Sequence, residues 1–418
     1  MDNETQQKVL TREDRMVGSD LEAWFSVGGG SGLEKALSDR AGIIPLVQAA
    51  GLRGMGGAGF PTAHKWQFVA DRPDDTDKHL IGNANEDEPG TLKDRFLLEQ
   101  TPHGVIEGAL IAALATGAND VILYLNPHEK NAITTTQKAV DQWHEHAFFQ
   151  RVEEALGKKL ELRVVLSSGL YIGGEETGAI ASVEGGFPFP RSKPPYPAEE
   201  GVNGEPTLVN NVETLANLPH ILASGADWFR ELGRGEACGT KLYTLSGDVL
   251  NEGVFELPLG TPLRELIDIH GGGMLEGREF KAVFTGGPSN TILTADDLDV
   301  PLDWDSVKAR HSNLGTGAMI VVSEGTGIVK RVTEYIDFFA ENSCGQCPSC
   351  KIGTRQISSL LTKIDTGRGL QNDLDNLGAL CEMLPGSGRC GLIDGAVTVL
   401  KSSLYKFRDE YVAQLLDR

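Results

Sequence analysis

The feature that most constrains the fold is a repeated alternation of short apolar runs with helical patterns in the first half of the chain. Residues 79–84, 121–125 and 160–165 are predicted strands, whereas residues 102–117 and 129–156 carry apolar residues at helical spacing and predict one helix each. Apolar strands that alternate with helices indicate a parallel, doubly wound α/β sheet. Ligands of such sheets bind at the carboxyl ends of the strands.

The rest of the chain divides where its composition changes. Residues 185–206 are dense in proline and predict a loop, and residues 207–224 return to a helical pattern. Further on, β-rich runs flank one helix-like stretch at residues 262–270, which predicts a small α+β domain. The last 90 or so residues are mostly helical in pattern. We therefore expect a helical or loosely ordered lead-in, a sheet domain, a small α+β domain and a helical domain, with boundaries at residues 1–40, 41–238, 239–326 and 327–418.

Charge and hydropathy exclude several classes of protein. The 418-residue chain has a formal net charge of −21, and a surface of that sign argues against nucleic-acid binding. Residues 1–21 are polar, and no run of about 20 apolar residues occurs, so the sequence predicts neither a signal peptide nor direct membrane insertion. We expect a cytoplasmic protein, or one held at a membrane surface only through a complex.

Five of the six cysteines lie near the carboxyl end, which favours a metal site over a disulfide framework. Cys344, Cys347 and Cys350 have the spacing of three ligands to one iron–sulfur cubane, although a structural zinc knuckle and three core cysteines are alternatives. Spacing alone does not choose a fourth ligand between Cys381 and Cys390. Cys390 precedes a predicted helix start, whose amides and dipole suit an anionic cluster, whereas Cys381 lies in an apolar helical pattern typical of a core.

Four polar segments lie where predicted strands or loops lead into the next element. The glycine-rich loop at residues 54–59 lets backbone amides approach an oxyanion, and Lys65 follows it closely. Residues 83–90, 171–177 and 210–214 place amides, glycines and carboxylates near strand ends. Each segment alone is equally consistent with an ordinary turn or a solvated surface.

Taken together, these segments and the cysteine site closely resemble the flavoprotein subunit of respiratory complex I and the related diaphorase subunits of NAD-dependent formate dehydrogenases and hydrogenases. The resemblance covers nearly the whole chain and rests on six motifs: GLRGMGGAGFPTAHKW, NANEDEPGTLKDR, YIGGEETGAIASVEG, KPPYPAEEG, PTLVNNVETLAN and SCGQCPSCKIGTR. It implies an α/β fold with a Rossmann-like FMN/NADH domain, a small β-grasp (SLBB) domain and a helical bundle with an iron–sulfur site. The implied activity is hydride transfer between NAD(H) and FMN with one-electron transfer to a [4Fe-4S] cluster, and no protein group is expected to act as a general acid or base.

The resemblance also implies roles for individual residues. The phosphate of FMN would be held by Gly54, Gly56, Gly57, Ala58 and Lys65. Further contacts to FMN would come from Asn83, Asn85, Gly174, Glu175, Asn210, Asn211 and Thr214. NADH would stack between Phe60, Phe68 and Tyr196 and would bond to Glu88 and Glu176. The cofactor-binding set is completed by Glu86, Tyr171, Lys193 and Val209, and the cluster would be held by Cys344, Cys347, Cys350 and Cys390.

Several residues depart from the family pattern. Met55 replaces a common Arg and Asn85 a common Asp, so two charges near the cofactors are missing, whereas Tyr196 in place of Phe still stacks. Gly82 and Gly173 replace cysteines that are not expected to bind the cluster. The Glu176 carboxylate is expected to repel a 2′-phosphate, which favours NAD over NADP.

The resemblance implies a thioredoxin-like [2Fe-2S] subunit and a larger iron–sulfur catalytic or electron-transfer subunit as partners. Only about 40 residues precede the flavin domain, so the [2Fe-2S] domain is expected on a separate polypeptide. The surroundings of Cys390 and residues 407–411 favour a formate dehydrogenase-type complex over complex I or an NAD-linked hydrogenase. A scaffold that has lost its flavin and a zinc-stabilised regulatory module are the competing classes.

Overall fold

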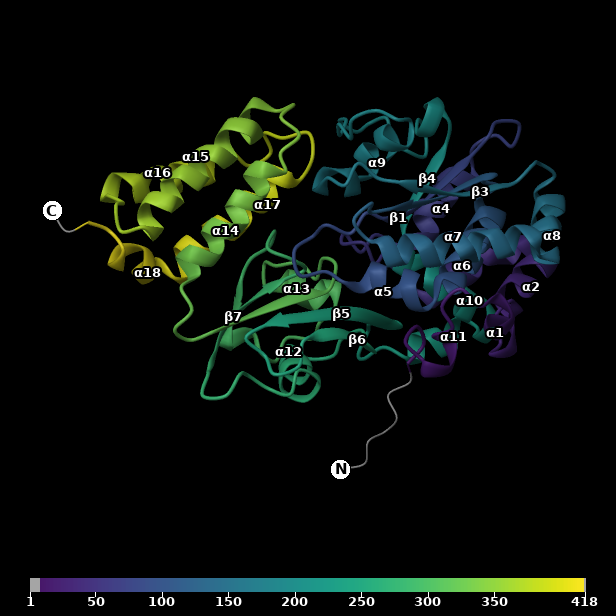
Figure 1. The fold of residues 1–418 in the computed structure, drawn as a ribbon, viewed down its shortest axis with the longest axis horizontal. Coiled ribbons are helices and arrows are strands. Elements are labelled where there is room, and N and C mark those ends of the chain that lie inside the picture. Colours follow the sequence, from purple (N-terminus) through teal and green to yellow (C-terminus); the bar gives the residue numbers. More distant parts are fainter. Residues whose placement is uncertain (1–7, 417–418) are drawn as a thin grey trace.

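A four-stranded parallel sheet organises the first part of the computed structural model, which describes residues 8–416 (Figure 1). Its strand order is β3-β2-β1-β4. The strands are β1 (His79–Ala84), β2 (Asp120–Leu125), β3 (Glu161–Leu166) and β4 (Thr207–Asn211). The chain runs from β1 through β2 to β3 and returns on the other side of β1 as β4, so the order reverses between β1 and β4. Ligands of open parallel sheets bind beside such a reversal, at the carboxyl ends of the strands.

Helices cover this sheet on both faces. In chain order they are α1 (Leu21–Ser26), α2 (Ser31–Ser38), α3 (Ile43–Ala50), α4 (Thr62–Ala70), α5 (Lys93–Gln100), α6 (Pro102–Thr116), α7 (Lys130–Glu145), α8 (Ala147–Leu156), α9 (Glu176–Val183), α10 (Val212–Ser224) and α11 (Ala226–Glu231). Helix α6 is buried along almost its whole length. Gly108 lets α6 approach α10 closely, since a Cβ there would lie 1.9 Å from the Leu215 carbonyl oxygen.

Alternate side chains of the strands enter two different cores. Leu80, Val121 and Leu208 point into the main core with α6 and α10, whereas their neighbours Ile81 and Val209 point into a smaller core with α9. This alternation is the period-two pattern of a sheet that is buried on both faces. It explains why apolar residues occupy successive positions in the middle of β1 and β4 and along most of β2.

The second unit is a five-stranded mixed sheet in the order β6-β5-β9-β7-β8. Its elements are β5 (Thr240–Gly247), β6 (Gly253–Pro258), α12 (Leu263–Glu265) with a π-helical turn (Leu266–His270), β7 (Phe280–Thr285), β8 (Leu293–Thr294), α13 (Trp304–Ala309) and β9 (Ala318–Ser323). Leu242 and Tyr243 extend the main core of the first unit, whereas Ala282 and Phe284 enter a core shared with the last helices. The second sheet therefore joins the other two units.

The third unit is a helical bundle at the end of the molecule opposite α1, α2 and α8 (Figure 1). It consists of α14 (Ile328–Glu341), α15 (Pro348–Asp365), α16 (Gln371–Met383), α17 (Leu392–Lys406) and α18 (Arg408–Ala413). The longer helices are amphipathic and bury one apolar face against each other, as expected for a small bundle. The fold class predicted from the sequence, α/β followed by a small mixed domain and a helical bundle, is confirmed.

Three local predictions are wrong. Residues 129–156 form two helices, because His146 is extended and its imidazole accepts a hydrogen bond from the Phe148 amide at 3.2 Å, which starts α8. Residues 207–211 form a strand and not the start of a helix, since they pair with β1. The second unit also contains α13, which Asp303 caps and which the sequence analysis missed. The domain boundaries predicted at residues 40, 238 and 326 stay predictions. One hydrophobic core contains buried residues on both sides of residue 238.

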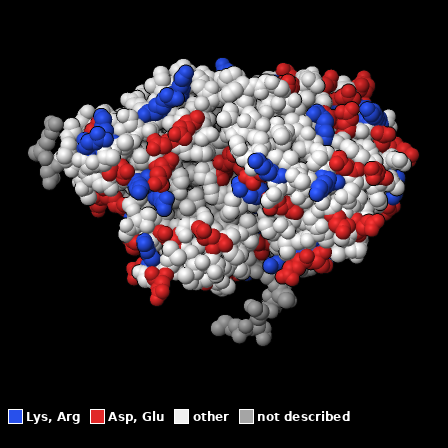
Figure 2. All heavy atoms as spheres, viewed as in Figure 1, with Lys and Arg blue, Asp and Glu red and all other residues white. Residues whose placement is uncertain are grey.

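Surface charge and hydropathy follow the composition. Acidic side chains outnumber basic ones at the right-hand end of the face shown in Figure 2, in keeping with the net charge of −21. In the described part of the chain, no helix combines the length and apolar character needed to cross a membrane.

Candidate cofactor and cluster sites

The glycine-rich loop between α3 and α4 is closed at its neck by two backbone hydrogen bonds. Gly54 N donates to Phe60 O at 2.8 Å, and Thr62 N donates to Leu52 O at 3.0 Å. No described residue accepts a hydrogen bond from the backbone amides of residues 56–59. Successive free amides in a glycine loop form a site for an oxyanion, so the loop fits the phosphate of FMN.

Two glycines of this loop are required by its neighbours. A Cβ at Gly56 would lie 2.9 Å from the Asn211 Cβ atom. Gly59 has a left-handed φ of +61°, and a Cβ there would lie 2.3 Å from the Trp304 ring of the second unit. The loop therefore packs between the start of α10 and α13. A residue larger than glycine at position 56 or 59 would displace the loop.

The start of helix α10 forms one wall of the site. Asn211 caps the helix by accepting a hydrogen bond from Glu213 N at 3.0 Å, and Thr214 Oγ1 accepts from Met55 N at 2.9 Å. Asn210 accepts from Trp66 Nε1 at 2.8 Å, and Val209 is buried in β4. The N-terminus of this 13-residue helix therefore lies against the glycine-rich loop, where its dipole favours an anion.

The turns after β1 and β3 interlock at the same sheet edge. Asn83 Nδ2 donates to Gly174 O at 2.9 Å, and Asn85 Nδ2 donates to Leu170 O at 3.1 Å. Ser167 Oγ also donates to Asn85 Oδ1. Gly174 permits this approach, because a Cβ there would lie 3.2 Å from the Asn85 carbonyl oxygen. The asparagines thus serve first to join the two turns, and Asn85 is almost fully buried.

Two lysines converge on the acidic residue that opens α9. Glu176 lies 3.0 Å from Lys65 Nζ and 2.6 Å from Lys193 Nζ. Burial raises the pKa of Glu176, but both lysines outweigh it, so its pKa is lower than usual. The neighbouring Glu175 caps α9 by accepting from Gly178 N at 3.0 Å. The charge of Lys65 is therefore paired with Glu176. The backbone amides of the glycine-rich loop are then the groups available to bind a phosphate.

The three predicted stacking residues are large aromatic groups exposed to solvent. The exposed fractions are 48% for Phe60, 54% for Phe68 and 55% for Tyr196. Phe60 ends the glycine-rich loop, Phe68 lies on α4 and Tyr196 lies in the proline-rich loop. Exposed rings beside charged groups are available to stack on a planar ligand.

Two glutamates after β1 have different surroundings. Glu86 accepts from Asp94 N at 2.8 Å and Arg95 N at 3.2 Å, so it caps α5, and burial raises its pKa to about 7. Glu88 accepts from Tyr171 Oη at 2.6 Å and from Ser289 Oγ at 3.3 Å. Burial raises the pKa of Glu88 to about 7 against the effect of these two donors. Ser289, from the second unit, was not predicted from the sequence.

The thiols of the third unit surround the start of α15. Cys347 directly precedes this helix, Cys350 lies in its first turn, and Cys390 precedes α17. The pKa of Cys390 is raised to about 11, mainly by burial and to a smaller extent by the nearby thiols of Cys344 and Cys350. These cysteines contact the apolar core of the bundle, whose low polarity suits a buried cluster.

Polar groups of the neighbouring loops contact the same thiols. Ser343 Oγ lies 3.2 Å from Cys350 Sγ, and Gln346 Nε2 lies 4.0 Å from Cys344 Sγ. Gln346 also donates to Pro190 O at 3.1 Å, which ties the cysteine loop to the proline-rich loop of the first unit. Hydrogen bonds to sulfur tune the potential of iron–sulfur clusters.

Cys381 lies apart from these thiols. It is buried in α16, and its pKa is raised to about 12 by burial, with Lys401 and Glu382 as its charged neighbours. Among the described residues, no three Cys, His, Asp or Glu side chains converge tightly enough to hold a single metal ion. In a cubane each cysteine binds a different iron atom, and Cys390, which lies near Cys344 and Cys350, is a better candidate for the fourth ligand than Cys381.

The fold and its two sites define an FMN- and iron–sulfur-dependent oxidoreductase of the NADH dehydrogenase class. The family model of the Nuo51 FMN-binding domain matches residues 47–220, that of the SLBB domain residues 242–292, and that of the NADH-ubiquinone oxidoreductase-F iron–sulfur binding region residues 330–414. The second F subunit of the NADH-quinone oxidoreductase of Rhizobium meliloti is 41% identical over 98% of both chains. The chain belongs to this family of NADH-quinone oxidoreductase F subunits, uses NAD(H) as its substrate, and carries FMN and a [4Fe-4S] cluster.

Two further relatives come from hydrogenases. The NADP-reducing hydrogenase subunit HndC of Solidesulfovibrio fructosivorans is 37% identical over 99% of this chain and 84% of the relative. A crystal structure of NAD⁺-reducing [NiFe]-hydrogenase in the air-oxidized state superposes with a TM-score of 0.83 and 35% identity, covering 96% of this chain and 67% of that one. The same fold therefore occurs in enzymes with different terminal reactions.

Proposed function

We propose that this chain is the NAD(H)-facing electron-transfer subunit of a multi-subunit redox complex. The observation that carries the proposal is that Tyr171 joins the polar turn after β1 to the apolar core of the helical bundle, against which the thiols also pack. Its hydroxyl donates to Glu88, and its ring packs edge-on against Phe338 and Phe339 of α14, with centroid distances of 5.1 and 6.2 Å. These contacts support a proposal in which the candidate nucleotide-binding turn and the helical bundle with the cysteines work as one unit.

Within this proposal, the chain's own residues bind and orient the reactants. The amides of residues 56–59 hold the flavin phosphate, and Phe60, Phe68 and Tyr196 stack the dinucleotide. Bound FMN supplies a hydride acceptor that can also release single electrons. Cys344, Cys347, Cys350 and Cys390 would hold the [4Fe-4S] cluster, which would supply a one-electron acceptor. Holding two reactants in register supplies the orientation that lowers the barrier to transfer.

The preference for NAD over NADP is part of the proposal. Glu176 places a carboxylate among the nucleotide-binding candidates, and a carboxylate repels a 2′-phosphate. Lys65 and Lys193 pair with it and offset part of that repulsion. We therefore expect a moderate preference for NADH. This expected preference for NADH differs from the NADP specificity that the name of the hydrogenase relative HndC states.

The test is reconstitution of the anaerobically purified chain with FMN, iron and sulfide. NADH should bleach the flavin, reduce ferricyanide and produce the electron paramagnetic resonance signal of a reduced cluster. We expect NADPH to have the lower kcat/KM, and E176Q to narrow that difference while the cluster signal is unchanged. A loaded chain that ignores NADH contradicts the proposal, and zinc in place of iron and sulfide supports the regulatory module instead.

For the parent complex, the formate dehydrogenase type remains our proposal from the sequence, with complex I and hydrogenase types as the alternatives that the relatives' names support. That preference rests partly on residues 407–411, which pack within the helical bundle. Glu410 accepts a hydrogen bond from Ile328 N at 2.9 Å, and Tyr411 is buried. Isolation of the tagged native complex decides the question. Formate-dependent NAD⁺ reduction and a co-purified thioredoxin-like [2Fe-2S] subunit would support the proposal, whereas hydrogen- or quinone-dependent activity would identify one of the alternatives.

A further inference from the structure

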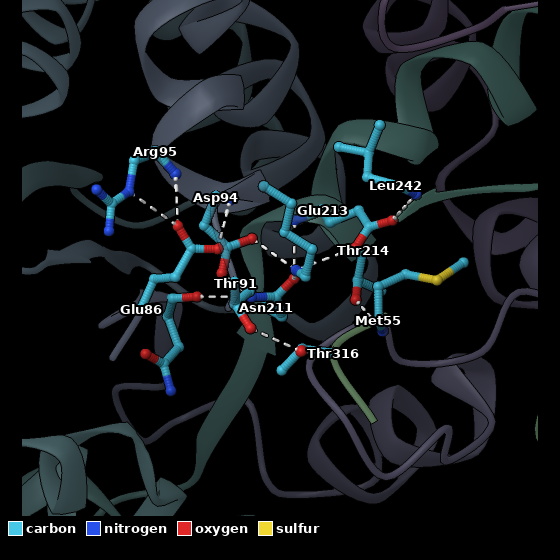
Figure 3. A network of polar contacts seen from close by, with 12 residues as sticks. Met55, Glu86, Thr91, Asp94, Arg95, Asn211, Glu213, Thr214, Leu242 and Thr316 are labelled. Carbon is cyan, nitrogen blue, oxygen red and sulfur yellow. Dashed lines mark hydrogen bonds and ion pairs between the residues drawn. The ribbon is translucent and has the colours of Figure 1, made fainter. Parts of the chain in front are cut away.

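A buried network of charged groups lies beneath the glycine-rich loop, and part of it comes from the second unit. Lys241 of β5 has a fully buried side chain, and its Nζ atom donates to Glu213 Oε2 at 3.0 Å and to Met55 O at 3.4 Å. The Glu213 carboxylate also accepts from Leu242 N at 2.8 Å, as Figure 3 shows. Lys241 thus joins the first strand of the second sheet to the carbonyl group of a loop residue 186 positions away.

The rest of the network ties the same carboxylate to the start of α10. Lys93 Nζ lies 3.0 Å from Glu213 Oε2 and donates to Asn211 Oδ1 at 2.9 Å. Asn211 Nδ2 donates in turn to Asp94 Oδ2 at 2.7 Å. Because Lys93 also pairs with Glu213, loss of Lys241 would leave that carboxylate buried with a cationic partner, which limits the cost to folding.

The Met55 residue is held on both sides of its α-carbon. Its N–H group donates to Thr214 Oγ1 at 2.9 Å, and its carbonyl oxygen accepts from Lys241. In a trans peptide the carbonyl and the next N–H group point in opposite directions. Lys241 holds the Met55 carbonyl group toward the buried network, so the Gly56 N–H group is directed away from that network. The glycines at positions 56 and 57 would otherwise permit this peptide to rotate.

We propose that Lys241 is a positioning residue for the flavin phosphate: it fixes the Met55–Gly56 peptide so that the loop amides converge on the anion. Phosphate binding and docking of the second unit are then coupled, because the group that orients the loop belongs to β5. Trp304 supports the same coupling, since this residue of the second unit packs against Gly59. The inference rests on the assignment of the loop at residues 54–59 to the phosphate of FMN.

The test compares FMN with riboflavin, which lacks the phosphate. Apoprotein affinities for both ligands are measured by quenching of flavin fluorescence in the wild type, K241M, E213Q and K281M. A hydrogen bond to a charged group is worth about a tenfold change in affinity. We expect K241M to lower FMN affinity about tenfold or more and riboflavin affinity less than about threefold, so that the ratio between the ligands falls.

K281M is the matched control. Lys281 is a largely buried lysine of the same sheet, and it donates to Thr326 O and pairs with Glu410 of the third unit, away from the loop. K281M should leave the FMN-to-riboflavin ratio unchanged. E213Q removes the carboxylate that holds Lys241 in place, so it should lower the ratio in the same direction as K241M. An equal loss of both ligands in K241M, or the same change of ratio in K281M, would overturn the proposal.

A measurement on the wild type covers the case in which K241M does not fold. FMN should slow amide hydrogen exchange in β5 more than riboflavin does at equal saturation, and equal protection by both ligands would overturn the coupling. The wild-type data also separate this inference from its premise. Failure of the wild type to prefer FMN to riboflavin refutes the phosphate assignment, whereas a preference that survives in K241M refutes only the role of Lys241.

Discussion

The candidate flavin site and the cysteine site differ in the groups that hold their loops in place. The glycine-rich loop is held by protein groups alone, with its neck closed by backbone bonds and its floor formed by the buried Lys241–Glu213 pair. The cysteine loop instead gathers thiols against an apolar core, with Ser343 and Gln346 as their polar contacts. A site made of amides and ion pairs can be ordered before its ligand binds, whereas the cysteine site is completed only when its metal binds.

This difference predicts how each cofactor affects stability. Metal that binds converging thiols contributes its binding free energy to folding, because no comparable site exists in the unfolded chain. FMN adds only its own affinity to a loop that is already ordered. We therefore expect the cluster to stabilise the helical bundle more than FMN stabilises the parallel sheet, and the first two predictions below each test one side of that contrast.

The largest effect is expected from loss of one cluster ligand. Cys347→Ser should abolish the cluster, measured as iron and acid-labile sulfide after reconstitution, while FMN affinity changes less than about twofold. The melting transition of the bundle should fall to that of the cluster-free protein. Cys381→Ser is the matched control, because Cys381 is buried in the same bundle but lies apart from the other thiols. A cluster that persists in the first variant, or is lost in the second, would contradict the ligand assignment.

A smaller effect, on the flavin side, is expected from Gly59→Ala. The new Cβ meets the Trp304 ring at 2.3 Å in a left-handed backbone, so we expect a loss of about 2–3 kcal/mol in unfolding free energy. FMN affinity should fall about tenfold or more as the loop moves, with the cluster retained. Gly157→Ala has a similar φ of +67° but no atom within 4 Å, and it should cost only about 1–2 kcal/mol without affecting FMN. Chemical denaturation and flavin titration measure both variants.

The two sites also differ in how much of them the sequence predicts. Three cysteines are identified by spacing alone, because a ligand set within one turn and loop is a local feature. The fourth is not, and the structure favours Cys390 because only the fold brings it beside Cys344 and Cys350. For the flavin site, the glycine-rich loop and the polar turns are visible as motifs. The contacts of Lys241 and Trp304 are not, since they cross from one unit to another.

The parallel sheet shows the same limit. β1, β2 and β3 are predicted within one residue at each end, because each is an apolar run bounded by turn residues. β4 is missed because α10 follows it without a turn, so Thr207 to Asn211 merges with the helical pattern. Its pairing with β1, 128 residues earlier in sequence at His79, is a long-range contact that local periodicity does not encode.

The smallest expected effect concerns Glu88, which contacts the helical bundle through Tyr171. Its pKa is about 7 in the folded chain, against an ordinary value of 4.5, so the folded state binds more protons than the unfolded state between these values. Stability should therefore decrease as the pH rises from about 5 to about 7.5, by about 1 kcal/mol after allowance for partial exposure. E88Q should flatten this dependence, as measured by denaturation at several pH values. E176Q is the control, because the pKa of Glu176 is lowered and its ionised form is favoured throughout this pH range. E176Q should reduce the free energy of unfolding without changing its dependence on pH.

An unchanged pH dependence in E88Q would contradict the raised pKa. It would show that Glu88 is ionised in the folded chain and that Tyr171 donates to a charged carboxylate.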